Sequence, residues 1–138
     1  MVTANAAGDR IGVTIGSLVS LSLEPPLIGI AVGKANALHE VLRAAGAFGV
    51  SLLRGDQADV AARFALGMPP ALLWDGLDVR DGATGAPLIA GALGWIECRV
   101  DTEHEVGDHT LFVGEVVVAE EGQRGTGLVY REHDYRAV

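Results

Sequence analysis

The sequence has 138 residues, enough for one domain with a sizeable buried core. Its net charge is −8 and it has no basic run, so we expect neither a nucleic-acid-binding protein nor binding to an anionic membrane. The single cysteine, Cys98, excludes an internal disulfide and favours a reducing, cytoplasmic compartment. We expect neither a signal peptide nor a membrane-spanning segment.

The chain begins with short β-like segments. Residues 2–4 have strand character, residues 5–10 have the composition of a turn, and residues 11–15 form a second apolar segment. This order predicts a β-hairpin at the N-terminus.

Small polar and apolar residues alternate over residues 16–23, which predicts a further strand. The alternation places Ser20 and Ser22 on one side and the apolar side chains between them on the other. Pro25 and Pro26 end this strand, because proline cannot donate to a β-ladder. The apolar run at 27–32 that follows is suited to a central strand.

The next segment has the signals of an amphipathic helix. Asn36 is a good N-cap, and Gly46 suits the position just after the last turn. Four apolar residues between them share one helical face: Leu38, Val41, Leu42 and Ala45.

Residues 48–53 are predicted to form a strand, and a second helix is expected after it with Asp56 as its N-cap. Its inward face would carry Val60, Ala61 and Phe64. Gly67 and the two prolines that follow are expected to end it.

The C-terminal half is mostly β. After an irregular stretch at 71–87, residues 88–102 and 110–119 are predicted to form a long hairpin that turns at 106–109, and residues 128–130 a short closing strand. About six strands and two helices follow from these patterns. Hairpin connections dominate, so residues 1–138 are expected to form a single mainly β domain, a small antiparallel barrel with helices outside it.

The junction at 33–36 joins a strand to a helix N-terminus through Gly33 and Lys34. Free N–H groups and the helix dipole favour an anion there, and Lys34 adds a positive charge. An ordinary strand-to-helix turn with a surface lysine explains the same residues. The P-loop sequence G-x-x-x-x-G-K-[ST] is absent.

Hydroxyl side chains are dense in the strand before the proline pair. They are suited to hydrogen-bonding a polar heterocycle, or simply to filling the half-buried face of a strand. The residues concerned are Thr14, Ser17, Ser20 and Ser22.

The histidines do not form a metal motif. His104 and His109 are five residues apart at a predicted hairpin, not four apart on a helix, so no metal site is expected. His109 beside Asp108 is either a ligand contact or a solvent-facing turn residue. Neither a G-x-S-x-G elbow nor the G-x-G-x-x-G fingerprint is present, so serine nucleophile chemistry and Rossmann-type binding are not expected.

Taken together and in order, several segments resemble the flavin reductase-like family, whose members are FMN-binding split β-barrels. The similar segments are GVTIGSLVSLSLEPPL at 12–27, GKAN at 33–36, FGVSLL at 48–53, AARFA at 61–65, ECRV at 97–100 and GDHTLFVGEV at 107–116, with Tyr130 and Tyr135 near the end. Each segment is weakly specific alone, but their order spans almost the whole chain.

The resemblance implies a set of ligand contacts. The flavin ring and ribityl chain would lie along Thr14, Ile15, Gly16, Ser17, Leu18 and Ser20. The phosphate would bind at Gly33, Lys34, Asn36 and Ala37. His109 would contact the nicotinamide, and Tyr135 and Arg136 would border the same cleft.

The chain departs from the family pattern in four places. Glu24 replaces the common aspartate before the prolines, Leu18 stands where an aromatic is frequent, and the turn at 34–37 has few hydroxyls. Family members also begin with a helix and a strand that are not found here. This implies a truncated start or a partner subunit that covers the first strand.

By resemblance, the expected activity is flavin reduction: hydride passes from NADH or NADPH to FMN or FAD, and reduced flavin is supplied to a partner monooxygenase. The cofactors carry this chemistry, so no catalytic acid or base is required. A homodimer is implied as well. The alternative is a non-catalytic flavin- or haem-binding split-barrel module, or a barrel kept only as a partner subunit.

Overall fold

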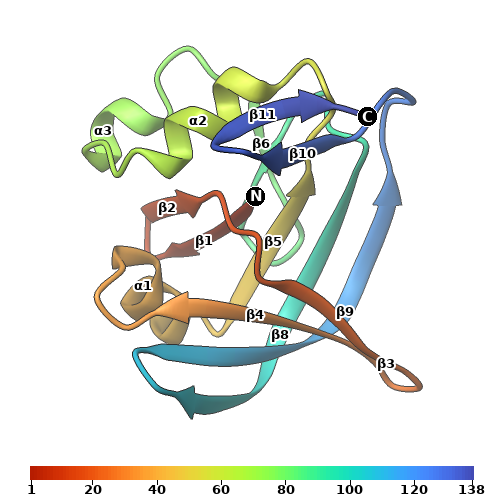
Figure 1. The fold of residues 1–138 in the computed structure, drawn as a ribbon. Helices are drawn as coiled ribbons and strands as arrows, with labels where there is room; N and C mark the ends of the chain where they lie inside the picture. Colours follow the sequence, from red (N-terminus) through yellow and green to blue (C-terminus); the bar gives the residue numbers. More distant parts are fainter.

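The computed structural model describes residues 1–138, and eleven strands and three helices make up the chain (Figure 1). The strands are β1 Val2–Ala6, β2 Asp9–Val13, β3 Leu18–Leu23, β4 Pro26–Gly33, β5 Ala47–Leu52, β6 Val79–Asp81, β7 Pro87–Ile89, β8 Gly94–Val106, β9 His109–Glu121, β10 Leu128–Arg131 and β11 Asp134–Ala137. The helices are α1 Ala37–Ala45, α2 Ala58–Ala65 and α3 Pro70–Leu73.

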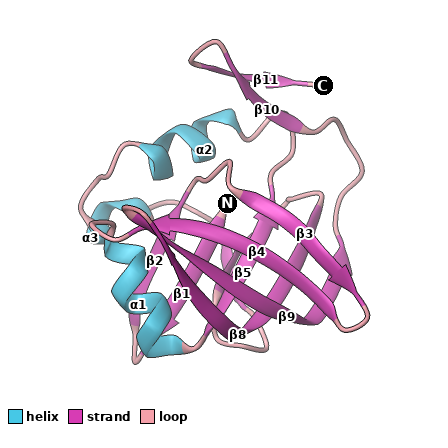
Figure 2. Ribbon diagram, turned by 60° about the horizontal axis from the view of Figure 1, so that its bottom comes forward, coloured by secondary structure: helices cyan, strands magenta, loops and turns pink.

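Seven strands form one antiparallel sheet in the order β2-β1-β5-β8-β9-β4-β3, and the sheet curls strongly (Figure 2). Its edge strands β2 and β3 are consecutive in the chain but do not pair with each other. The mainly β, antiparallel fold with flanking helices is therefore confirmed. Two smaller sheets, β6-β7 and β10-β11, complete the structure, and the β10-β11 hairpin lies beyond α2, apart from the large sheet (Figure 2).

Helix α1 forms as the sequence predicts. The Asn36 side chain accepts a hydrogen bond from the Leu38 N–H at 2.9 Å, and Gly46 ends the helix with φ 64°. A positive φ costs glycine little, so Gly46 terminates the helix without strain. Leu38 and Leu42 are fully buried against the sheet, and this burial fixes the turn at residues 33–37 in place.

Helix α2 also buries the predicted face, which consists of Val60, Ala61 and Phe64. The predicted cap is wrong: Gln57 occupies the N-cap position without a capping hydrogen bond. The Asp56 carboxylate instead forms an ion pair with Arg54 at 2.6 Å. The Arg54 guanidinium therefore binds the carboxylate that would otherwise cap α2.

The stretch expected to be irregular, 71–87, contains elements. Pro70, which was expected to help end α2, instead begins the short helix α3 just before this stretch. In the first turn of a helix its missing N–H costs no hydrogen bond. Strands β6 and β7 then pair as a small hairpin.

Strand β3 differs from its prediction. A bulge between Ser20 and Ser22 leaves Leu21 without a cross-strand partner, so the two serines do not share one face as expected. The strand is a sheet edge with exposed apolar side chains, and Leu23 is 88% exposed. Strand β4, by contrast, is flanked by β9 and β3, as predicted for an inner strand.

Candidate functional site

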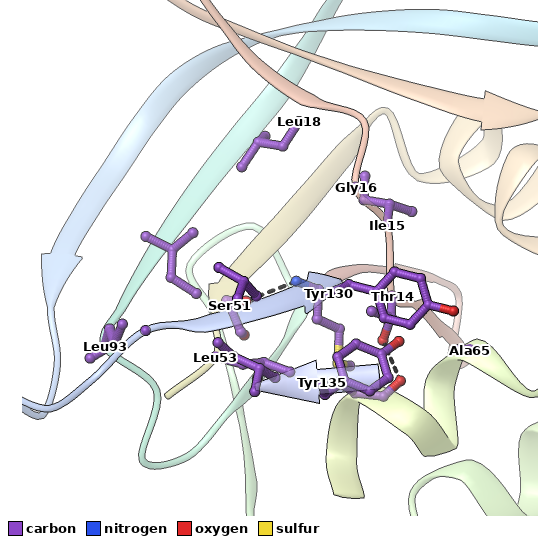
Figure 3. A pocket seen from close by; sticks show the side chains of 16 residues that line it. Thr14, Ile15, Gly16, Leu18, Ser51, Leu53, Ala65, Leu93, Tyr130 and Tyr135 are labelled. Atoms are coloured by element: carbon purple, nitrogen blue, oxygen red, sulfur yellow. Dashed lines mark hydrogen bonds between the residues drawn. The ribbon is translucent and has the colours of Figure 1, made fainter. Parts of the chain in front are cut away.

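A cavity of about 840 Å³ lies between the connection from β2 to β3, the end of β5, helix α2 and the β10-β11 hairpin (Figure 3). Most of its lining is apolar, which suits a flat, largely hydrophobic ring system. The lining residues are Met1, Thr14, Ile15, Gly16, Leu18, Ser51, Leu52, Leu53, Ala61, Ala65, Leu93, Gly127, Leu128, Val129, Tyr130 and Tyr135.

The segment from Thr14 to Leu18 forms one wall of this cavity. The Thr14 hydroxyl donates to the Ala61 carbonyl of α2 at 2.8 Å, and the Ser17 hydroxyl donates to the Ala31 carbonyl of β4 at 2.8 Å. These two bonds hold the segment at both sides, and the Thr14 hydroxyl oxygen keeps a lone pair for a ligand in the cavity. Ser17 itself does not line the cavity, and Ser20 lies further along the exposed edge strand.

The turn before α1 borders a second, smaller cavity of about 440 Å³, lined among others by Ala35, Asn36 and Ala37. Ala65 lines both cavities, so they adjoin. The Ala35 N–H has no hydrogen-bond partner within the chain and is available to an anion. The Asn36 side chain is already used by the helix cap.

Gly33 and Lys34 lie at the edge of this turn, outside both cavities. The Lys34 N–H donates to the Asp108 carbonyl at 2.9 Å, and its ammonium group forms an ion pair with Glu105 at 3.2 Å. Lys34 is the only lysine of the chain. An anion at the turn therefore competes with Glu105 for this ammonium group.

His109 is the first residue of β9, directly after the two-residue turn that follows β8, and it also lies outside both cavities. Its Nδ1 is 2.7 Å from an Asp108 carboxylate oxygen. This hydrogen bond, with the nearby charge of His109, lowers the pKa of the Asp108 carboxyl. The pairing of β4 with β9 places His109 opposite Gly33. The histidine is thus next to the turn before α1, with Nε2 unpaired.

Two tyrosines line the large cavity from the C-terminal hairpin. The Tyr130 and Tyr135 ring centroids are 4.9 Å apart with an interplanar angle of 48°. Burial, and secondarily Tyr130, raise the pKa of the Tyr135 hydroxyl, so it remains protonated at neutral pH and can donate a hydrogen bond. Arg136 does not line this cavity, and its guanidinium contacts Glu132 and Asp134.

Several lining residues were not predicted, among them Ser51, Leu53, Leu93 and Val129. They come from the ends of separate elements that only the fold brings together. Tyr130 also lines the cavity and was not predicted as a contact, although this tyrosine is part of the family resemblance noted in the sequence.

The structure places no three His, Cys, Asp or Glu side chains together as a metal site. Cys98 is fully buried, and desolvation, with a contribution from Glu97, raises the pKa of its thiol to about 12. A thiol in this state is neither a nucleophile nor a metal ligand at neutral pH. None of the three helices is long and apolar enough to cross a membrane.

Comparison with known proteins gives consistent matches. The model of the flavin reductase like domain matches residues 1–138. The reductase component of 4-hydroxyphenylacetate 3-monooxygenase from Thermus thermophilus is 39% identical over 136 residues, which cover 99% of this chain and 85% of that protein.

Among the solved structures that share the fold are two flavin reductases. The NADH:FAD oxidoreductase of Streptomyces globisporus, in complex with NAD and FAD fragments, has a TM-score of 0.90 at 38% identity, covering 98% of this chain and 81% of that one. BorF, the flavin reductase component of a bacterial two-component tryptophan halogenase, has a TM-score of 0.92 at 38% identity, covering 99% and 87%. The resemblance noted in the sequence is thereby confirmed, and this chain belongs to the flavin reductase-like family.

Proposed function

We propose that this chain is an NAD(P)H:flavin oxidoreductase that transfers hydride from NADH or NADPH to FMN or FAD. The observation that carries the proposal is the pair of adjoining cavities, one apolar and ring-sized, the other at a helix N-terminus next to the chain's only lysine. A flavin has the same two parts, a flat ring system and a phosphate. Relatives named NADH-dependent FAD reductase and FMN reductase support the assignment.

The residues present fit a flavin. The isoalloxazine ring would lie in the large cavity along Thr14–Leu18, with the two tyrosines of the hairpin at its far side. The phosphate would bind the Ala35 N–H, the first turn of α1 and the Lys34 ammonium group. Ser20 and Arg136, which the resemblance also implies as contacts, line neither cavity.

When bound, the flavin supplies the hydride-accepting chemistry, and the protein supplies binding, orientation and exclusion of water. The apolar lining keeps water from the ring face, and the Thr14 and Ser17 hydrogen bonds keep the wall rigid. His109 holds its Nδ1 proton against Asp108, which leaves Nε2 as an acceptor in the neutral imidazole for the nicotinamide carboxamide. No side chain has to act as a general acid or base.

We also propose that the chain works as a homodimer through β3. This edge strand has unpaired backbone groups and exposed apolar side chains, which a second copy would cover. Leu18 lies on β3 and lines the large cavity, so a partner there would also narrow the mouth of the site. The exposed residues are Leu18, Val19, Leu21 and Leu23.

The physiological partner we infer is a monooxygenase that receives reduced flavin. Relatives named as reductase components of monooxygenases support this role. A cytoplasmic location fits the unpaired, buried Cys98.

Steady-state oxidation of NADH and of NADPH with FMN, FAD and riboflavin in turn tests the activity. The expected result is protein-dependent oxidation with at least one flavin. Flavin binding without any acceleration would instead support a non-catalytic flavin-binding module.

A further inference from the structure

A buried polar pair joins helix α1, which follows the proposed phosphate-binding turn, to strand β9, which begins with His109. His39, in the first turn of α1, is 3% exposed, and Thr110, the residue after His109 in β9, is 1% exposed. The His39 Nε2 and the Thr110 hydroxyl oxygen are 2.8 Å apart. His39 lines neither cavity, so an effect of His39 on a ligand would act through the groups that it holds.

The surroundings of the His39 ring define how it bonds. Its Nδ1 is 3.1 Å from a carboxylate oxygen of Glu40, and a carboxylate only accepts, so Nδ1 carries a proton. In the neutral imidazole Nε2 then accepts from the Thr110 hydroxyl. The edge of the ring packs against Phe112, with ring centroids 5.4 Å apart and an interplanar angle of 68°. Both ring nitrogens are therefore used, and the ring orientation is fixed.

The backbone already connects this region, through the β4-β9 ladder and the Lys34 N–H bond to the Asp108 carbonyl, and two side-chain ion pairs add to it. The Lys34 ammonium group pairs with Glu105 at 3.2 Å, and Arg43 pairs with Glu103 at 2.8 Å. All four of these side chains are at least 40% exposed, so water and salt weaken both pairs. The His39–Thr110 bond is shielded from both, which makes it the firm side-chain connection between the helix and the hairpin.

We propose that His39 and Thr110 are positioning residues that keep the phosphate-binding turn and His109 at a fixed separation. This inference rests on the proposed function, in which the turn at 33–37 holds the flavin phosphate and His109 holds the nicotinamide. The flavin accepts the hydride and the nicotinamide donates it, and the two stay aligned only if the residues that hold them keep a fixed separation. His39 is on the helix that follows the phosphate-binding turn, and Thr110 is next to His109 in β9.

The test is Thr110→Val, which removes the hydroxyl and keeps the shape. We expect the dissociation constant of FMN to rise about fivefold and kcat/KM for NADH at saturating FMN to fall about tenfold, the scale of one lost buried hydrogen bond acting on both ligands. Thr110→Ser, which keeps the hydroxyl, restores both values. If Thr110→Val does not fold, Thr110→Ala is measured instead, with the same expectation.

Thr3→Val is the matched control, because Thr3 is also fully buried and its hydroxyl donates to the Pro87 carbonyl at 2.5 Å, away from the phosphate-binding turn and from His109. It should lower thermal stability comparably and leave both ligand parameters within twofold. The proposal is overturned if Thr110→Val and Thr3→Val have the same kinetics, or if Thr110→Ser is as impaired as Thr110→Val. Absence of NADH oxidation by the unmodified protein would instead overturn the proposed function.

Discussion

Gly33 lies directly opposite His109 in the β4-β9 pair, and a β-carbon at position 33 would be 3.9 Å from the His109 Nε2. The C-terminal end of β4, which leads into the turn proposed to bind the phosphate, therefore lies beside His109, the histidine proposed to contact nicotinamide. A single methyl group fits at this distance, but a branched side chain would occupy the space beside the imidazole.

Gly33→Val is therefore expected to raise the KM for NADH about tenfold with little loss of stability, because valine is favourable in a strand and position 33 has no strained backbone. Gly33→Ala is the control and should remain within twofold of the unmodified protein. Steady-state kinetics and thermal denaturation measure the two effects. Equal KM values for NADH in the two variants would contradict the proposed contact between His109 and the nicotinamide.

Lys34→Ala should weaken FMN binding about fivefold and leave riboflavin binding unchanged, since only FMN carries a phosphate for the ammonium group. Glu105→Gln should have the opposite effect on FMN, because it frees Lys34 from its ion pair. Fluorescence titration measures both ligands. Because Lys34 is the only lysine, its modification by an amine reagent, followed by mass spectrometry, should be slowed by FMN and not by riboflavin. Equal protection by both would place the phosphate elsewhere.

Cys98 gives a pH dependence with a defined sign. The folded thiol has a pKa of about 12, raised from 9.0, so between these values the unfolded chain has lost a proton that the folded chain keeps. The folded state is then favoured less as the pH rises, and the free energy of unfolding falls by about 1.4 kcal/mol per pH unit from this group. Urea denaturation of the unmodified protein and of Cys98→Ala measures the difference. A Cys98→Ala variant with the same alkaline slope would refute it.

Glu97 is predicted to stabilise the loop before β7. The residue is 2% exposed, and its carboxylate accepts from the Ala83 and Thr84 N–H groups and the Thr84 hydroxyl at 2.7–3.2 Å. Glu97→Ala leaves these donors without an acceptor and should lower the free energy of unfolding by about 3 kcal/mol. Glu115→Ala, an exposed residue with no ion pair, should change it by less than about 0.5 kcal/mol. Similar losses for both variants would contradict this role.

Leu21→Asp is expected to dissociate the proposed dimer, because it places a charge on the exposed face of β3 at the bulge. Val106→Asp is the control, since Val106 is also exposed but lies at the far end of β8. Sedimentation velocity should give a monomer for the first variant and a dimer for the second. A monomeric unmodified protein, or a dimeric Leu21→Asp variant, would exclude β3 as the interface.

Local signals were sufficient to predict much of the fold. Asn36, Gly46 and the apolar face of α1 predicted that helix correctly, because its caps and its burial agree. The bulge at Leu21 and the cap of α2 were not predictable in the same way. The bulge depends on how β3 pairs with β4, and the Asp56 carboxylate is bound by Arg54 rather than by the helix.

The candidate site was predictable only in part. Thr14, Ile15, Gly16, Leu18 and Tyr135 line the large cavity, and Asn36 and Ala37 line the adjoining one. The remainder of the wall comes from residues such as Leu53, Leu93 and Leu128, which are ordinary apolar residues in sequence. Their position depends on long-range strand pairing, which no local pattern encodes.

Hydride transfer itself is measured by mixing the purified chain and FMN anaerobically with NADH in a stopped-flow instrument and following the loss of oxidised flavin absorbance. The expected result is a rate that rises in proportion to protein concentration and falls when deuterium replaces the transferred hydrogen at C4 of NADH. A rate equal to that of NADH and FMN without protein would contradict the proposed oxidoreductase.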